Sequence, residues 1–120
     1  MSKDGTIFII DDDASIREVF EIILLEQGYP VRQISSEQEL EQRLLIERPR
    51  LIFLDLNFGE SKGQDVAQKL KANTKTEKIP IIIVSALSNA KEIALEIGVS
   101  DVLEKPFQIE DVLNIVKKHY

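Results

Sequence analysis

The sequence predicts a doubly wound α/β fold with a five-stranded parallel sheet, and two observations lead to this fold class. Three short apolar runs, Thr6–Ile10, Leu51–Leu54 and Ile81–Val84, show no polar alternation, which is the pattern of strands covered on both faces. Amphipathic helical patterns lie between the strand-like runs, and such alternation builds a parallel sheet with right-handed crossovers. A chain of 120 residues has the size of one domain.

Two weaker apolar runs complete the sheet. Val31–Ile34 and Val102–Leu103 contain or adjoin polar residues, so we expect them to form the edge strands. With the three wholly apolar strands at the centre, the strand order 2-1-3-4-5 satisfies the pattern. This order places the switch point between the first and third strands, and sites in such sheets form at the carboxyl ends of the strands.

Five helical patterns fill the intervals between the strands. The first helix presents its apolar residues on one face and stops before Gly28, and the second begins at Ser36 with Glu39 at capping-box spacing and ends before Pro49. The other three helices are marked by apolar residues at helical spacing, namely Val66, Ala67 and Leu70, then Ile93, Ala94 and Ile97 before Gly98, and finally Ile109, Val112, Leu113 and Val116.

Composition excludes several classes of function. The absence of cysteine removes disulfides, thiolate metal sites and cysteine nucleophiles, and a single histidine, His119, rules out a histidine metal cluster and argues against Ser-His-Asp catalysis. A net charge of −6 argues against direct nucleic-acid binding. No apolar run approaches the ~20 residues that span a bilayer, and the N-terminus lacks a signal-peptide core, so we expect a cytoplasmic protein without membrane contact.

Polar residues gather where the predicted strands end. The first strand runs into Asp11-Asp12-Asp13, the third meets Asp55, the fourth meets Ser85 and the fifth leads to Lys105. Clustered carboxylates repel one another, and Mg²⁺ relieves such repulsion with few protein ligands. A metal, a lysine and a hydroxyl suit the oxygens of a phosphoryl group, and an aspartate can accept that group. No Walker-type phosphate loop is present.

Each of these residues alone has an ordinary structural explanation. We expect Asp13 mainly to cap the first helix, while Ser85 could be a turn residue and Lys105 a solvated charge. Asp11 and Asp12 follow a buried strand directly, so their carboxylates need partners. The convergence of all these groups on one sheet edge favours a functional site.

Together, the motifs resemble the response-regulator receiver domain of two-component signalling, chemotaxis regulators included. The resemblance extends from Thr6 to His119 and rests on Asp11-Asp12, Asp55, Gly63 eight residues later, Ser85-Ala86 and Lys105-Pro106-Phe107. It implies a flavodoxin-like (βα)5 sandwich that forms a single receiver domain over residues 1–120.

The resemblance also implies roles. Asp55 would be phosphorylated by a histidine kinase or a histidine phosphotransfer protein, Ser85 would hydrogen-bond a phosphoryl oxygen, and Lys105 would pair with the phosphoryl group. Asp12 would bind Mg²⁺ directly and Asp11 mainly through water, together with Asp55 and the backbone carbonyl of Asn57. Pro106 would hold the lysine loop, often through a cis peptide. Such a domain catalyses only its own phosphorylation and dephosphorylation. We expect Lys105 to serve the phosphorylated state more than the resting fold.

Three features depart from the family pattern. Val102 stands where the family usually carries an aromatic or histidine switch residue. Either the signal passes through residues 86–89 and a short fourth helix, which we favour because Ser85 keeps the hydroxyl, or the domain chiefly passes phosphoryl groups on. Gly59 replaces a common proline, so the loop over residues 57–63 is expected to be more mobile. The segment between Ser85 and Lys105 is shorter than in typical members.

Two other functions remain open on the sequence. The first is a degenerate receiver that binds a partner protein without phosphorylation, which Val102 and the shortened segment would permit. The second is an enzyme that acts on an external phosphoryl or acyl substrate, but the chain has no insertion that could build a substrate pocket.

Overall fold

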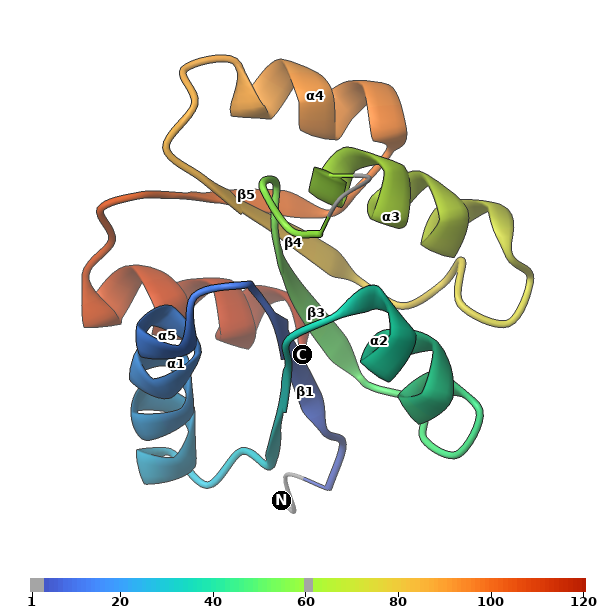
Figure 1. Ribbon diagram of the computed structural model, residues 1–120. Helices are drawn as coiled ribbons and strands as arrows, with labels where there is room; N and C mark the ends of the chain where they lie inside the picture. Colours follow the sequence, from blue (N-terminus) through green and yellow to red (C-terminus); the bar gives the residue numbers. More distant parts are fainter. Residues whose placement is uncertain (1–3, 60–61) are drawn as a thin grey trace.

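The computed structural model describes residues 4–59 and 62–120, and within them five strands alternate with five helices (Figure 1). The elements are β1 (Ile7–Ile10), α1 (Ala14–Glu26), β2 (Val31–Ile34), α2 (Glu37–Leu44), β3 (Leu51–Asp55), α3 (Lys62–Ala72), β4 (Ile81–Ser85), α4 (Ala90–Ile97), β5 (Asp101–Glu104) and α5 (Ile109–His119). In the described ranges no helix is both long and apolar enough to cross a membrane.

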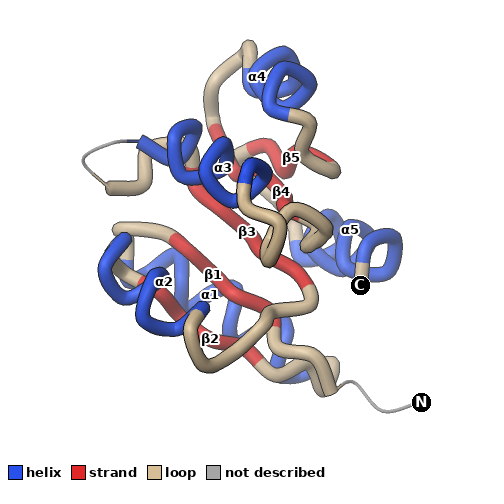
Figure 2. Tube along the Cα trace, turned by 90° about the vertical axis from the view of Figure 1, so that its right-hand side faces the viewer, coloured by secondary structure: helices blue, strands red, loops and turns tan. Residues whose placement is uncertain are grey.

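The strands form one parallel sheet in the order β2-β1-β3-β4-β5, which confirms the order expected from the apolar runs. Figure 2 shows the strands side by side in this order. The two runs with polar residues, β2 and β5, lie at the edges. The three wholly apolar runs lie at the centre, because only central strands lose both faces and both edges to the rest of the protein.

The strand boundaries differ in part from those expected. β1 begins at Ile7 rather than Thr6, while β3 and β4 each extend one residue further, to Asp55 and Ser85. β5 is longer than the expected pair of residues, because backbone pairing with β4 continues through polar positions as far as Glu104. The polar side chains of Asp55 and Ser85 therefore belong to the last residues of paired strands.

The sheet separates two apolar cores. On one face, alternate strand residues such as Ile10, Leu54 and Ile83 pack against α2, α3 and α4. On the other face, the intervening residues such as Ile9 and Phe53 pack against α1 and α5. Figure 1 shows α1 and α5 together, with α2, α3 and α4 across the sheet from them. Both layers hold the central strands rigidly, so the residues at the strand ends are held with them.

The helix caps expected from the sequence form, with one difference. Asp13 caps α1, and its carboxylate accepts a hydrogen bond from the N–H two residues further on at 2.8 Å. Ser36 caps α2 and accepts a hydrogen bond from the N–H of Glu39 at 3.1 Å. The Glu39 carboxylate reaches the N–H of Ser35 rather than that of Ser36, so the reciprocal bond of the capping box is displaced by one residue.

Gly63 lies where α3 passes closest to the end of β3. A Cβ at this position would stand 2.2 Å from the backbone oxygen of Asp55 and 2.8 Å from the Cα of Leu56. The N–H of Gly63 donates to the carbonyl oxygen of Leu56 at 2.9 Å. The absence of a side chain at Gly63 thus lets α3 pack directly against the backbone that carries Asp55.

We expect Gly63→Ala to lower the free energy of unfolding by about 1–3 kcal/mol, because backbone atoms, not a flexible side chain, would have to move. Chemical denaturation measures this loss. Gly98→Asn serves as the control, since Gly98 has a left-handed φ of 84° that Asn tolerates and nothing lies within 4 Å of its missing Cβ. Equal losses in the two variants would show that the close approach at Gly63 carries no special cost.

Candidate functional site

Four of the polar side chains named from the sequence converge at the carboxyl edge of the sheet. Asp55 and Ser85 end β3 and β4, while Asp11 and Lys105 directly follow β1 and β5. Backbone hydrogen bonds to the sheet hold Asp11 and Lys105 in place. The N–H of Asp11 donates to the carbonyl of Ile34 at 3.3 Å, and the N–H of Lys105 donates to the carbonyl of Ser85 at 2.9 Å. The expected convergence of these groups is therefore present.

The Lys105 ammonium links the two buried carboxylates of the site. Its Nζ lies 3.3 Å from Oδ1 of Asp55 and 3.7 Å from Oδ2 of Asp11. The Asp55 and Asp11 side chains are only 8% and 5% exposed, whereas that of Lys105 is 26% exposed. The Lys105–Pro106 peptide is cis, in the arrangement the sequence suggested. One partly exposed cation thus serves two carboxylates that solvent barely reaches.

Burial makes the charge on Asp11 costly. Burial raises the pKa of Asp11 above its ordinary value of 3.8, and the neighbouring charge of Asp55 raises it further. The N–H of Asp13, which donates to Asp11 Oδ1 at 2.8 Å, and the Lys105 ammonium only partly offset these effects. A second cation in this crevice would favour the ionised form of Asp11.

Asp12 and the loop after β3 form the outer side of the site. Asp12 is exposed, and its two carboxylate oxygens lie 3.3 and 3.2 Å from the backbone nitrogen of Gly59. This N–H would be missing if a proline stood at Gly59, and the φ of Gly59 is 72°. Asn57 is exposed two residues beyond Asp55. Residues 60 and 61 of the loop expected to be mobile lie outside the described residues.

Ser85 and Val102 lie on the β4–β5 side of the site. The Ser85 side chain is buried, and its Oγ accepts a hydrogen bond from the N–H of Leu87 at 2.9 Å. Val102 pairs with Ile83 in the sheet and packs, partly buried, against the core formed with α2, α3 and α4. The hydroxyl therefore holds the beginning of the loop that leads from β4 to α4.

The charge of the site fits a divalent cation. The carboxylates of Asp11, Asp12 and Asp55 carry three negative charges against the one positive charge of Lys105, which leaves two negative charges. Within the described residues, no three acidic or histidine side chains already stand together as a metal cluster. Mg²⁺ needs only one or two carboxylates and keeps several waters, so these carboxylate oxygens suit it.

One contact of the site was missed by the sequence analysis. The guanidinium of Arg17, on α1, donates from Nη1 to the backbone oxygen of Asp11 at 2.8 Å. The only signal in the sequence is the position of an arginine one helical turn beyond the cap residue Asp13. That signal is weak, because a charged residue early in a helix is ordinarily solvated.

The burial of Asp11 and Asp55 changes the basis for the expectation that Lys105 serves the phosphorylated state more than the resting fold. That expectation assumed exposed carboxylates. We now expect Lys105→Ala to lower the free energy of unfolding by about 1–2 kcal/mol without metal, between the values for exposed and buried pairs. Mg²⁺ should stabilise this variant more than the parent, because the metal then supplies the missing positive charge. Thermal unfolding with and without Mg²⁺ measures both effects.

Lys91→Ala is the matched control for Lys105→Ala. Lys91 pairs with Glu104 at 3.7 Å, and both side chains are largely exposed. This variant should lose no more than a few tenths of a kcal/mol. An equally small loss for Lys105→Ala, with the same response to Mg²⁺ as the parent, would show that solvent already screens the Lys105 contacts.

Comparison with curated proteins gives the family. The family profile of the response regulator receiver domain matches residues 7–117. The transcriptional regulatory protein GltR of Pseudomonas aeruginosa is 32% identical over 120 residues, which cover 98% of this chain and 50% of that protein. The chain spans about half the length of the curated relatives it matches.

Solved structures give the same result. A putative response regulator from Chloroflexus aurantiacus superposes with a TM-score of 0.89 at 28% identity, over 95% of each chain. The receiver domain of the sensor histidine kinase PA1611 from Pseudomonas aeruginosa, which holds a magnesium ion in its active-site cleft, superposes with a TM-score of 0.84 at 23% identity over 96% of each chain. The chain belongs to the response-regulator receiver domain family of two-component signalling.

Proposed function

We propose that the domain accepts a phosphoryl group on Asp55 from a phosphohistidine, carried by a histidine kinase or a histidine phosphotransfer protein. The observation that carries the proposal is the environment of Asp55. Its carboxylate is nearly buried at the end of a central strand, 3.3 Å from the Lys105 ammonium and in the same crevice as Asp11 and Asp12. This arrangement presents a fixed oxygen nucleophile in a site that also holds a cation.

The transfer step needs only the Asp55 carboxylate and the phosphohistidine of the donor as reacting groups. An oxygen of Asp55 attacks the phosphorus atom, an O–P bond forms, and the P–N bond to the donor imidazole breaks with its electron pair left on nitrogen. Lys105 neutralises charge on the phosphoryl oxygens. The Oγ of Ser85 accepts a hydrogen bond from the N–H of Leu87, and a hydroxyl that accepts can still donate its proton to a phosphoryl oxygen.

Asp11, Asp12, Asp55 and the backbone carbonyl of Asn57 would hold Mg²⁺ in this site. When bound, the cation would offset the negative charge that the attacking carboxylate and the phosphoryl oxygens bring together. The support for this assignment is the excess of two negative charges and the oxygen-only donor set. In this site Asp55 serves both as a metal ligand and as the phosphoryl acceptor.

The partners follow from the same chemistry. We infer that the domain meets a phosphohistidine protein in the cytoplasm. We also infer that the domain does not itself bind nucleic acid, because its net charge is −6. Among the described residues, no contact in the site favours the alternative of a phosphorylation-independent binding module. The Lys105 ammonium beside the Asp55 carboxylate, and the Ser85 hydroxyl at the end of the neighbouring strand, support phosphoryl transfer instead.

Asp55→Asn tests the acceptor. After incubation with Mg²⁺ and phosphoramidate, the parent should gain the mass of one phosphoryl group, and the variant should gain none because an amide oxygen is a poor nucleophile. Intact-protein mass spectrometry measures the gain. Asp65→Asn, in the exposed first turn of α3, is the control and should be phosphorylated like the parent. Phosphorylation of Asp55→Asn at the parental level would reject Asp55 as the acceptor.

We further propose that the phosphorylated state is transmitted through residues 86–89 and α4. Val102 is β-branched and stiff at its first side-chain torsion, so it cannot move a ring-sized group. The Ser85 hydroxyl, in contrast, already bonds the N–H of Leu87, so a shift of that hydroxyl toward a phosphoryl oxygen would pull the loop.

Backbone amide chemical shifts with and without beryllofluoride check this route. We expect the largest changes at residues 85–98, while Val102 keeps one side-chain rotamer. A rotamer change at Val102, together with a new binding surface on β5, would contradict the proposed route.

A further inference from the structure

Arg17 connects three elements of the fold beneath the site. Its Nη1 donates to the backbone oxygen of Asp11 at 2.8 Å, and its Nε donates to Oε1 of Gln33, on β2, at 3.1 Å. The amide nitrogen of Gln33 in turn donates to the carboxylate of Glu21, one turn further along α1. Both ends of the Gln33 amide are therefore fixed, and Arg17 reaches from α1 to the end of β1 and to β2.

These bonds fix the peptide unit between Asp11 and Asp12. On one side of Asp11, its own N–H donates to the carbonyl of Ile34 at 3.3 Å. On the other side, its carbonyl accepts from Arg17, and that carbonyl shares a planar peptide with the nitrogen of Asp12. The plane of this peptide fixes where the nitrogen and the Cα of Asp12 lie, while the N–H of Gly59 holds the carboxylate itself. Arg17 therefore holds the backbone from which the Asp12 side chain extends, without touching that side chain.

We propose that Arg17 is a positioning residue for divalent-metal binding, which holds the Asp11–Asp12 peptide and so keeps the Cα of Asp12, from which its carboxylate extends, beside Asp11. This inference rests on the proposed function, because it takes Asp12 to be a metal ligand. Arginine suits the task because its rigid planar guanidinium donates to two acceptors at fixed angles. A lysine ammonium is a point charge on a flexible stem and cannot reproduce that fork.

The positive charge of Arg17 should weaken Mg²⁺ binding, whereas its positioning role should strengthen it. Because the two effects have opposite signs, substitutions can distinguish them. A guanidinium near the site repels a divalent cation. If charge alone mattered, Arg17→Met would tighten Mg²⁺ binding and Arg17→Lys would leave it unchanged. If positioning matters, both variants weaken binding, because both lose the paired hydrogen bonds.

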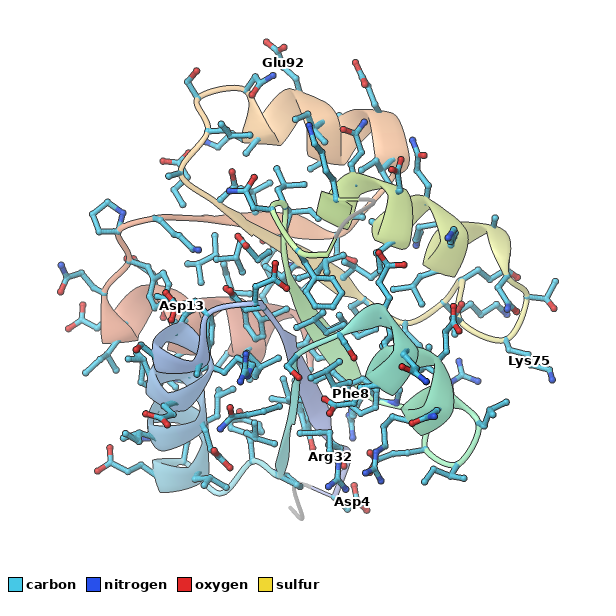
Figure 3. The ribbon with its side chains drawn as sticks, viewed as in Figure 1. Asp4, Phe8, Asp13, Arg32, Lys75 and Glu92 are labelled. Atoms are coloured by element: carbon cyan, nitrogen blue, oxygen red, sulfur yellow. The ribbon has the colours of Figure 1, made fainter. Side chains whose placement is uncertain are left out.

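The experiment measures the Mg²⁺ dissociation constant by calorimetric titration of the intact chain, together with the melting temperature in metal-free buffer. We expect Arg17→Lys to weaken Mg²⁺ binding about tenfold, the lower end of the effect known for groups that orient metal ligands. Arg17→Met should also weaken it, but by less, because loss of the positive charge partly offsets the loss of positioning. Arg32→Lys is the matched control and should bind Mg²⁺ like the parent. Arg32 also lies on β2, but its Nε bonds Glu47 at 3.3 Å. Figure 3 shows Arg32 well away from Asp13, the residue that caps α1.

A lower melting temperature with an unchanged dissociation constant would overturn the proposal, because it would give Arg17 a merely structural role. The proposal would also be overturned if Arg17→Lys bound Mg²⁺ as the parent does and Arg17→Met bound it more tightly. Should the Arg17 variants fail to fold, Gln33→Met removes only the second acceptor of the guanidinium and should weaken binding by a smaller factor. Unchanged binding there would count against the proposal.

Two further arms separate this inference from the proposed function. Asp12→Asn should bind Mg²⁺ much more weakly than the parent. If the parent itself binds no Mg²⁺, or if Asp12→Asn binds as the parent does, the proposed metal site fails and the inference fails with it. If Asp12→Asn loses binding and Arg17→Lys does not, the site stands and only the inference fails.

Discussion

The structure depends on the burial of two carboxylates at the ends of central strands, where a single ammonium reaches both. Asp11 and Asp55 are placed there by β1 and β3, whose side chains are packed on both faces. Placing such charges away from water is costly unless they are paired and hydrogen-bonded. The cis Lys105–Pro106 turn, the hydrogen bond from Asp13 and the guanidinium of Arg17 are all arranged around these two strand ends. The same excess of negative charge is what the proposed divalent cation would offset.

Much of the fold could be predicted from the sequence because its signals are local. Apolar runs marked the central strands, and Gly98 marked the end of α4, where it adopts a left-handed conformation. β5 was underestimated because Asp101 and Glu104 break the apolar pattern, although backbone pairing with β4 ignores side-chain polarity. Local pattern cannot show where pairing between distant segments stops.

The sequence was enough to predict which residues gather at the site, but not which atoms of these residues contact one another. The carboxyl ends of neighbouring parallel strands meet, so Asp11, Asp55, Ser85 and Lys105 were certain to be close once the strand order was known. The depth of the two carboxylates, the bond from Gly59 to Asp12 and the reach of Arg17 depend on side-chain directions and loop backbone. Sequence spacing does not encode these features, so it could not show that the carboxylates beside Lys105 are buried.

The two apolar cores share no residue, because the sheet stands between them. Substitutions on the surface of α1 and α5 therefore leave the packing beneath α2, α3 and α4 intact, and the reverse also holds. Each layer can therefore change its sequence and its outer surface without repacking the layer on the other side of the sheet.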